Sequence, residues 1–147
     1  MPTVLTPYLM VTGAAEAIDF YRRSFGAVET MRLTGGDGHI GHAEMRIGEA
    51  AFMLADESPE LVPNMRGPRT LQATTVSLHL VVPDVDAVVG RAVEAGATLE
   101  RPVADQAYGE RTGVLVDPFG HRWFVATPLQ NGEPHPAPDP AAAQVIS

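Results

Sequence analysis

An internal repeat is the feature of this chain that most constrains its fold: the order strand, helix, strand, strand, strand can be read twice. Leu9-Met10-Val11 in the first half corresponds to Leu80-Val81-Val82 in the second, and a helical pattern follows each. The same pair ends both predicted helices, as Gly26-Ala27 and as Gly96-Ala97. A repeat of this size indicates two copies of one supersecondary unit, neither of which can bury its sheet alone.

The helix is the clearest element of the first half. Ala14, Ile18, Tyr21 and Phe25 fall at helical spacing, with charged residues off that stripe, and Gly26 ends the pattern. Alternating apolar residues between turn signals predict the strands around it. These strands are predicted at residues 4–11, 28–33, 39–47 and 50–54.

The second half ends in its most distinctive stretch, the tight turn Asp117-Pro118-Phe119-Gly120. Pro118 has the φ that the first central turn position needs, Gly120 tolerates positive φ, and the Asp117 side chain can cap the turn. The strand-like runs on both sides make it a β-hairpin. The other elements are predicted as a strand at 74–82, a helix at 85–95, and strands at 98–103, 110–116 and 122–126.

These patterns predict an α+β fold in four segments: a first module at residues 1–56, a linker at 57–73, a second module at 74–127 and a tail at 128–147. The linker contains Pro59, Pro63 and Pro68 and has no periodicity. The tail is rich in Pro and Ala and is expected to be disordered.

Composition excludes several classes of function. The formal charge of -8, without any Lys/Arg run, argues against a nucleic-acid or anionic-membrane partner. The absence of cysteine excludes disulfides, thiolate catalysis and cysteine-based zinc sites. Neither a signal-peptide pattern nor an apolar run of membrane-spanning length is seen. We therefore expect a soluble, cytoplasmic protein.

Four stretches carry a resemblance to a known family. They are Phe20-Tyr21-x-x-x-Phe25-Gly26-Ala27, His42-Ala43-Glu44, Tyr108-Gly109-Glu110-Arg111 and the run from Asp117 to Trp123. Together with the repeat, they resemble the vicinal oxygen chelate superfamily, also called the glyoxalase/bleomycin-resistance/dioxygenase proteins, and within it the PhnB-like branch. The resemblance covers about residues 4–127.

The resemblance implies a half-open, eight-stranded barrel that is made from two βαβββ modules and is commonly completed in a homodimer. The cup of this barrel holds a small molecule. In the enzymes of the superfamily, it also holds a divalent metal with two ligands from each module, one early in the first strand and one late in the last.

The positions that the resemblance assigns to the metal ligands do not carry good ligands here. Thr6 and Ser77 fall at the two first-strand positions, and Phe124 at the position of the second-module glutamate. Its first-module counterpart falls at Phe52 or Met53. Transition metals prefer imidazole and carboxylate to these groups, so no metal cofactor is expected.

A displaced metal site is the alternative. Strand periodicity places His79 on the same face as Ser77, and His42 on the same face as Glu44. His79, His42 and Glu44 are therefore the candidate ligands of such a site. The competing interpretation of each histidine is a hydrogen-bonded packing residue.

The candidate ligand-binding residues combine aromatic rings with a few polar groups. Such rings bury a large apolar area against a flat ligand, and polar groups at a barrel mouth orient it. The alternative is that the aromatic residues form ordinary core and that the polar residues are solvated. The candidates are Tyr8, His42, Phe52, His79, Tyr108, Arg111, Trp123 and Phe124.

Two functions follow from these residues. The first is a binding protein that sequesters a hydrophobic or aromatic compound, such as an antibiotic, without chemistry. The second is a divalent-metal-dependent glyoxalase-like lyase or isomerase, or a dioxygenase, with a displaced metal site. The missing ligands favour the first, and the catalytic residues of the second cannot be assigned from the sequence.

Overall fold

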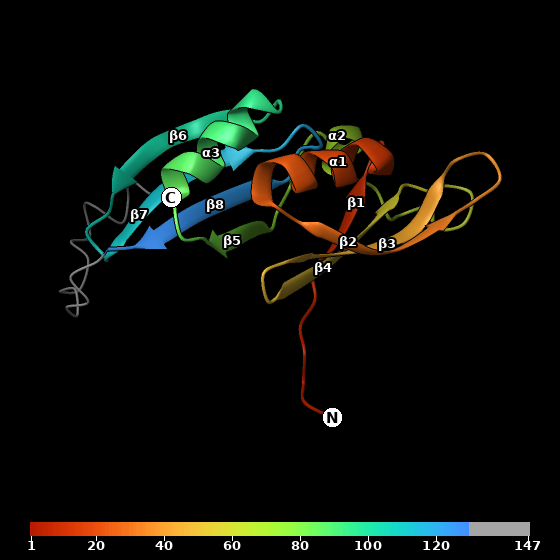
Figure 1. The fold of residues 1–147 in the computed structure, drawn as a ribbon. Coiled ribbons are helices and arrows are strands. Elements are labelled where there is room, and N and C mark those ends of the chain that lie inside the picture. Colours follow the sequence, from red (N-terminus) through yellow and green to blue (C-terminus); the bar gives the residue numbers. More distant parts are fainter. Residues whose placement is uncertain (130–147) are drawn as a thin grey trace.

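The computed structural model describes residues 1–129, in which eight strands and three helices are present (Figure 1). The part of the predicted tail from residue 130 onward lies outside the described residues. The elements are β1 (Tyr8–Val11), α1 (Ala14–Phe25), β2 (Val28–Thr34), β3 (Ile40–Ile47), β4 (Ala50–Asp56), α2 (Pro68–Leu71), β5 (Ser77–Val81), α3 (Val85–Glu94), β6 (Thr98–Asp105), β7 (Glu110–Val116) and β8 (Arg122–Pro128).

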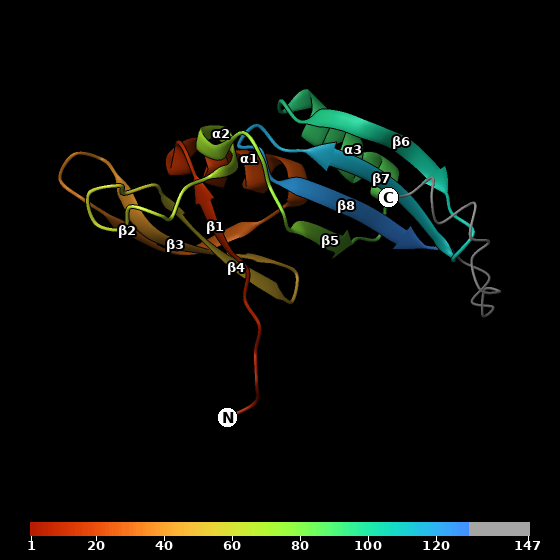
Figure 2. The ribbon, with the colours of Figure 1, turned by 180° about the vertical axis from the view of Figure 1, so that it is seen from behind.

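The strands form two four-stranded sheets with the same topology. Their orders are β1-β4-β3-β2 and β5-β8-β7-β6, and in each sheet the first and last strands of the module pair in parallel. Figure 2 shows β8 between β5 and β7. The predicted α+β fold of two βαβββ modules is therefore confirmed. The sheets are not closed into a barrel, which fits the half-open arrangement.

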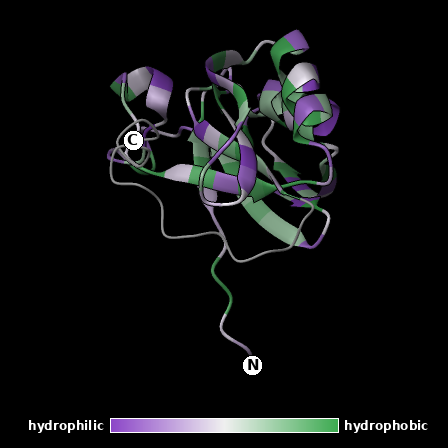
Figure 3. Cartoon of the chain, turned by 90° about the vertical axis from the view of Figure 1, so that its left-hand side faces the viewer, coloured by the Kyte–Doolittle hydropathy of each residue, from purple (hydrophilic) through white to green (hydrophobic). Residues whose placement is uncertain are grey.

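The two long helices bury the faces that their sequences predict. Ala14, Ile18, Tyr21 and Phe25 of α1 are buried, and Gly26 ends the helix in the left-handed conformation. The helix α1 packs against α3, and residues of both modules share one hydrophobic core. Figure 3 shows hydrophobic and hydrophilic residues alternating along helices and strands, as expected for elements buried on one side.

The starts of two strands and the predicted linker differ most from the sequence-based prediction. The first strand begins at Tyr8 instead of Val4, because Val4 and Leu5 are 74% and 94% exposed and no strand pairs with them. Likewise β5 begins at Ser77 instead of residue 74. The predicted linker contains the short helix α2, which starts at Pro68, a residue well suited to the first turn of a helix.

The turn between β7 and β8, residues 117–121, is called the closing turn here, and it is centred on the buried Asp117. One carboxylate oxygen of Asp117 accepts hydrogen bonds from the Tyr21 hydroxyl (2.6 Å) and the Trp123 indole N–H (2.9 Å). The other accepts from the backbone N–H groups of Phe119 (2.9 Å) and His121 (3.0 Å). Burial and the neighbouring Asp117 carboxylate raise the pKa of Tyr21 well above its ordinary value.

The closing turn belongs to the second module but packs on the first. His121 Nε2 lies 2.9 Å from the backbone oxygen of Met10 in β1. The ring of Phe119 lies edge-on to that of Phe20 in α1, with centroids 6.3 Å apart. The predicted capping role of Asp117 is confirmed, and the same residue also ties the two modules together.

Each module caps the start of its long helix with a side chain from its last strand, and the two capping residues occupy equivalent positions in the two modules. In the first module, Asp56 of β4 accepts hydrogen bonds from the N–H groups of Gly13 (2.9 Å) and Ala14 (2.7 Å). In the second, the Thr127 hydroxyl of β8 accepts from the N–H of Val85 (2.9 Å). These bonds satisfy N–H groups that a helix start leaves without partners.

Candidate functional site

The candidate site lies on the side of the sheets turned away from α1 and α3, which we call the open face. Side chains alternate along a strand, so Phe52 and Leu54 point into the buried core while Met53 and Ala55 point to the open face. Tyr8 pairs with Met53 in register and is 44% exposed. In the first module, the open face includes Tyr8, Met10, Val28, Met31, Leu33, His42, Glu44, Met53 and Ala55.

Three polar side chains of this face form a hydrogen-bonded row. The Tyr8 hydroxyl lies 2.7 Å from His42 Nδ1, and His42 Nε2 lies 2.9 Å from Glu44 Oε2. Burial, and then the charge of Glu44, raise the pKa of Tyr8. The phenol therefore stays protonated at neutral pH, and the row offers a polar ligand group both a hydroxyl and a carboxylate.

The second module has a polar pair at the equivalent place. His79 takes the register position of Tyr8, because His79 pairs with Phe124 as Tyr8 pairs with Met53. His79 Nε2 lies 3.1 Å from Glu110 Oε2, so both residues are on the open face. Glu110 was not among the sequence candidates. Its place opposite His79 depends on the strand register, which the sequence does not fix.

Two of the predicted aromatic residues, Phe52 and Trp123, are buried on the helix side of the sheets, and both line a small cavity of about 100 Å³ together with His79. Phe52 and Trp123 are each only 4% exposed and point into the core toward the helices. The ring of Trp123 lies 4.7 Å from that of Phe25 in α1, and its N–H is bound by Asp117. Successive side chains of a strand point to opposite faces of the sheet, so Phe124 points to the open face because Trp123 points to the helices.

Arg111 was predicted at the cup rim and lies elsewhere. Its guanidinium donates to Asp86 in α3 (2.8 Å) and to Asp105 in β6 (3.0 Å), so it is held on the helix side of the sheet. Tyr108 is half-buried in the turn between β6 and β7. Of this predicted rim motif, only Glu110 contacts a residue of the open face.

The positions assigned to metal ligands do not form a metal site in the structure. Thr6 precedes β1, Ser77 pairs with Arg122, and Met53 and Phe124 carry no ligand atom that Zn²⁺ or Fe²⁺ prefers. Within residues 1–129, no three His, Asp or Glu side chains come close enough to hold an ion. The donor set of a single chain therefore does not fit the divalent metal of the enzymes.

The histidines proposed for a displaced site face the same limit. Both ring nitrogens of His42 already have hydrogen-bond partners, Tyr8 and Glu44. His79 has one such partner, Glu110, and both belong to the second sheet, not to the sheet of His42. Within residues 1–129, the His42–Glu44 contact and the His79–Glu110 contact therefore do not join into one set of three or more ligands.

A small apolar cavity of about 170 Å³ opens beside Tyr8. The segment after β4 covers it, and this segment contributes Leu61, Val62 and Met65. The strands contribute Tyr8 and Met10. Methionine side chains adapt to ligands of different shapes, so a lining with two of them suits a variable apolar group. The sequence did not point to this cavity, because the residues that cover it belong to the predicted linker, which has no periodic pattern.

Comparison with known proteins supports this architecture. The family model of the Glyoxalase/Bleomycin resistance protein/Dioxygenase superfamily matches residues 3–125. An uncharacterized protein of Mycobacterium tuberculosis is 45% identical over 127 residues, which make up 86% of this chain and 75% of that protein. In residues 1–129, every helix is too short or too polar to cross a membrane.

Solved structures have the same fold over almost all of the described chain. TioX from Micromonospora sp. ML1 is 27% identical, with a TM-score of 0.68 over 87% of this chain and 100% of that one. Protein PA1353 from Pseudomonas aeruginosa is 25% identical, with a TM-score of 0.70 over 88% and 100%. A PhnB protein from Bacillus cereus, 20% identical with a TM-score of 0.66 over 86% and 98%, shares the fold.

Proposed function

Because the chain belongs to the Glyoxalase/Bleomycin resistance protein/Dioxygenase superfamily, we propose that it is a cytoplasmic small-molecule binding protein that sequesters a hydrophobic or aromatic compound, such as an antibiotic. The ligand lies on the open face and undergoes no chemistry there. The cytoplasmic location rests on the composition of the chain.

The observation that carries the proposal is the apolar lining of the open face where the enzymes of the family hold a metal. Met53 and Phe124 occupy two of those positions, and a cavity of about 170 Å³ lies beside Tyr8. This volume accommodates one ring-sized group, and typical ligand pockets are larger, about 300–1,000 Å³. The rest of the ligand therefore lies on the open face outside the cavity, with the Tyr8–His42–Glu44 row as its polar contact.

A second copy of the chain would cover the remainder of the ligand. Val28 and Val81 both point to the open face and are more than half exposed, at 62% and 55%. Burial of such side chains in a homodimer would turn two open faces into one enclosed cup. Sedimentation of Val81→Glu and of Val93→Glu, a control on the exposed side of α3, tests this: only the first is expected to be monomeric. A monomeric wild type contradicts the dimer.

Titration with a neutral aromatic dye, Nile red, followed by a panel of hydrophobic antibiotics, tests the binding function. Calorimetry is the better readout, because Trp123 is buried in the core and cannot report directly on the open face. We expect Met53→Ala to weaken binding about tenfold, the equivalent of about 1.4 kcal/mol. The exposed control Val93→Ala should leave affinity unchanged. Equal affinities for both variants, or no binding of any compound, contradict the proposal.

The second candidate function is the metal-dependent lyase, isomerase or dioxygenase with a displaced site. One observation favours it: each module places a histidine and a glutamate in contact on its open face, as His42–Glu44 and His79–Glu110. Two such pairs from two chains would supply four suitable ligands.

Elemental analysis of untagged protein after exposure to Zn²⁺, Ni²⁺, Mn²⁺ and Fe²⁺ separates the two functions. The enzyme requires about one ion per chain, lost in His79→Ala but kept in His121→Ala, whose imidazole instead contacts the Met10 backbone oxygen. If the protein only binds its ligand, a chelator should change neither the metal content of the protein nor its affinity for the ligand.

A further inference from the structure

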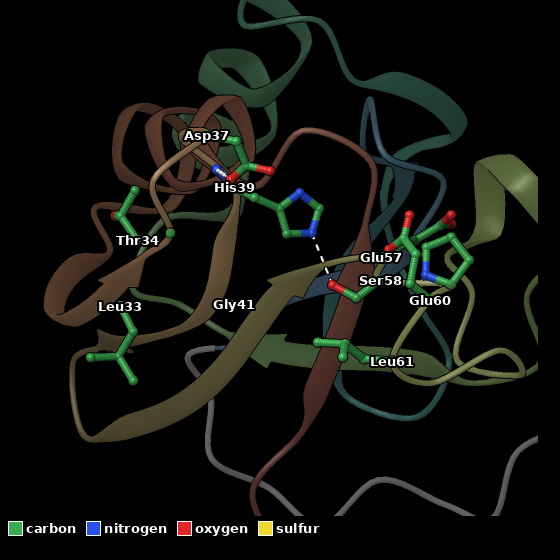
Figure 4. A pocket seen from close by; sticks show the side chains of 11 residues that line it. Leu33, Thr34, Asp37, His39, Gly41, Glu57, Ser58, Glu60 and Leu61 are labelled. Carbon is green, nitrogen blue, oxygen red and sulfur yellow. Dashed lines mark hydrogen bonds between the residues drawn. The ribbon is translucent and has the colours of Figure 1, made fainter.

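A second depression lies at the far end of the first module, between the β2–β3 hairpin and the segment after β4. It is a groove of about 500 Å³, within the range of small-molecule sites. Figure 4 shows hairpin residues on one side of this groove and residues of the following segment on the other. The lining residues used below are Asp37, His39, Glu57, Ser58 and Glu60.

A serine and a histidine that line this groove are aligned with an aspartate next to it. Ser58 Oγ lies 3.0 Å from His39 Nε2, and His39 Nδ1 lies 4.0 Å from Asp56 Oδ2 (Figure 4 shows the first contact). Hydroxyl, imidazole and carboxylate thus follow one another in the order that nucleophilic catalysis uses. Asp56 ends β4 and Ser58 follows it closely in the chain, whereas His39 lies 19 residues before Ser58, at the end of the β2–β3 hairpin.

The surrounding structure holds the row in place. The Asp56 carboxylate accepts hydrogen bonds from the N–H groups of Gly13, Ala14 and, at 2.9 Å, Ile40, which fix it beside the imidazole. The backbone N–H of His39 donates to Asp37 Oδ1 (2.9 Å). The side chain of His39 is 39% exposed, so a substrate can reach it, whereas that of Asp56 is only 13% exposed.

We propose that Ser58, His39 and Asp56 form an ester-hydrolysing site. The Ser58 oxygen attacks the carbonyl carbon of an ester while its proton passes to His39 Nε2. The ester C–O bond then breaks, and the leaving alcohol takes that proton, which leaves an acyl group on Ser58. A water molecule, deprotonated by His39, attacks the acyl carbon; the carboxylic acid is released and the proton returns to Ser58.

Asp56 is a positioning residue in this scheme. Its negative charge favours the His39 tautomer with a proton on Nδ1, and this tautomer leaves Nε2 free to accept from Ser58. A distance of 4.0 Å is longer than a hydrogen bond, so the carboxylate acts through its charge in the free protein. Catalytic hydrogen bonds are often long before a substrate is bound.

The groove also indicates the class of ester. Asp37, Glu57 and Glu60 line it, without any arginine, which favours an alcohol portion that is cationic or neutral over an anionic one. Ser58 also lines the apolar cavity of about 170 Å³. That cavity accepts a short apolar acyl group. The chain contains neither cysteine nor lysine, so neither a thiol nor a lysine amine competes as nucleophile.

A fluorophosphonate probe provides the first test, because a serine oxygen activated by histidine displaces its fluoride and stays bonded to phosphorus. Mass spectrometry of the labelled full-length protein should find the probe on Ser58. The second measurement is hydrolysis of 4-nitrophenyl butyrate. We expect Ser58→Ala and His39→Gln each to lower kcat/KM at least about 100-fold, the typical contribution of such groups. Thr74→Ala removes a hydroxyl outside the groove and should keep the wild-type rate.

Circular dichroism of each variant separates loss of the site from loss of the fold. His39 is replaced instead of Asp56, because Asp56 also caps α1 and its replacement would change the fold as well as the site. Wild-type hydrolysis by Ser58→Ala, or labelling of other residues instead of Ser58, overturns the proposal. Nile red binding at the open face does not depend on the His39 imidazole, so its persistence in His39→Gln tells this proposal apart from the binding function.

Discussion

Replacement of Asp117 by alanine tests the central structural claim, that this carboxylate joins the two modules. The variant leaves the Tyr21 hydroxyl and the Trp123 indole N–H buried without their acceptor, and the N–H groups of Phe119 and His121 also lose theirs. Each buried donor left unpaired costs about 1–3 kcal/mol, so the two side chains alone account for roughly 2–6 kcal/mol.

One effect opposes this loss. Asp117 is 3% exposed, and no cationic side chain in residues 1–129 forms an ion pair with it, so its removal also relieves the cost of burying a charge. We therefore expect Asp117→Ala to lower the free energy of unfolding by about 2–4 kcal/mol, the lower part of the range for the two unpaired side-chain donors. Tyr21→Phe removes only one of the four bonds and should cost about 1–2 kcal/mol.

Urea denaturation, followed by Trp123 fluorescence and by far-ultraviolet circular dichroism, measures both losses. Asp105→Ala is the matched control, because that aspartate is largely exposed at the surface and should leave the midpoint unchanged within error. A loss below about 1 kcal/mol for Asp117→Ala would refute the reasoning. So would an equal loss for Tyr21→Phe, since one bond would then carry the whole effect.

Three further predictions concern the same region. Gly120→Ala should destabilise the protein by about 2–4 kcal/mol, because φ is +93° and the new Cβ would lie 2.6 Å from the Cβ of Pro68 in α2. The control Gly36→Ala, which has open space around it, should hardly change the thermal unfolding temperature. Trp123→Ala should lower the free energy of unfolding by about 3–5 kcal/mol. Phe124→Ala should lower it less and should instead weaken ligand binding, measured by calorimetry. A larger loss of stability in Phe124→Ala than in Trp123→Ala would contradict the faces assigned to the two side chains. The pKa of Tyr21 is raised in the folded state, so the protonated phenol stabilises the fold fully below a pH of about 10, the pKa of tyrosine in the unfolded chain. Above that pH the free energy of unfolding falls by up to about 1.4 kcal/mol per pH unit. Tyr21→Phe should remove this part of the alkaline loss when denaturation is measured as a function of pH.

The sequence predicted those elements whose determinants are local. The helix at residues 14–25 and the strand at 110–116 have the predicted bounds, because the apolar spacing of each is complete and a glycine or a turn marks its ends. The closing turn was predictable in the same way, since Asp117, Pro118 and Gly120 each have a local conformational role.

The orientation of side chains across the sheets required information that the sequence lacks. A shift of one residue moves a side chain from the core to the open face, and this distinguishes Phe52 from Met53 and Trp123 from Phe124. The sequence therefore could not tell which aromatic residues face the helices, as Phe52 and Trp123 do, and which face outward, as Phe124 does. The contacts of Glu110 with His79, and of Ser58 with His39, depend on how distant segments meet, which no local pattern encodes.

The way each module caps its own helix has a consequence for how the protein folds and how it arose. Asp56 and Thr127 each bond to a helix start 42 residues earlier in the chain. A module therefore completes its helix only when its last strand has docked, so helix and sheet should form cooperatively instead of one after the other. The segment from the first strand of a module to its capping residue is thus the smallest unit that completes its own helix cap, and a gene duplication must copy it whole to yield two equivalent modules that then share one core.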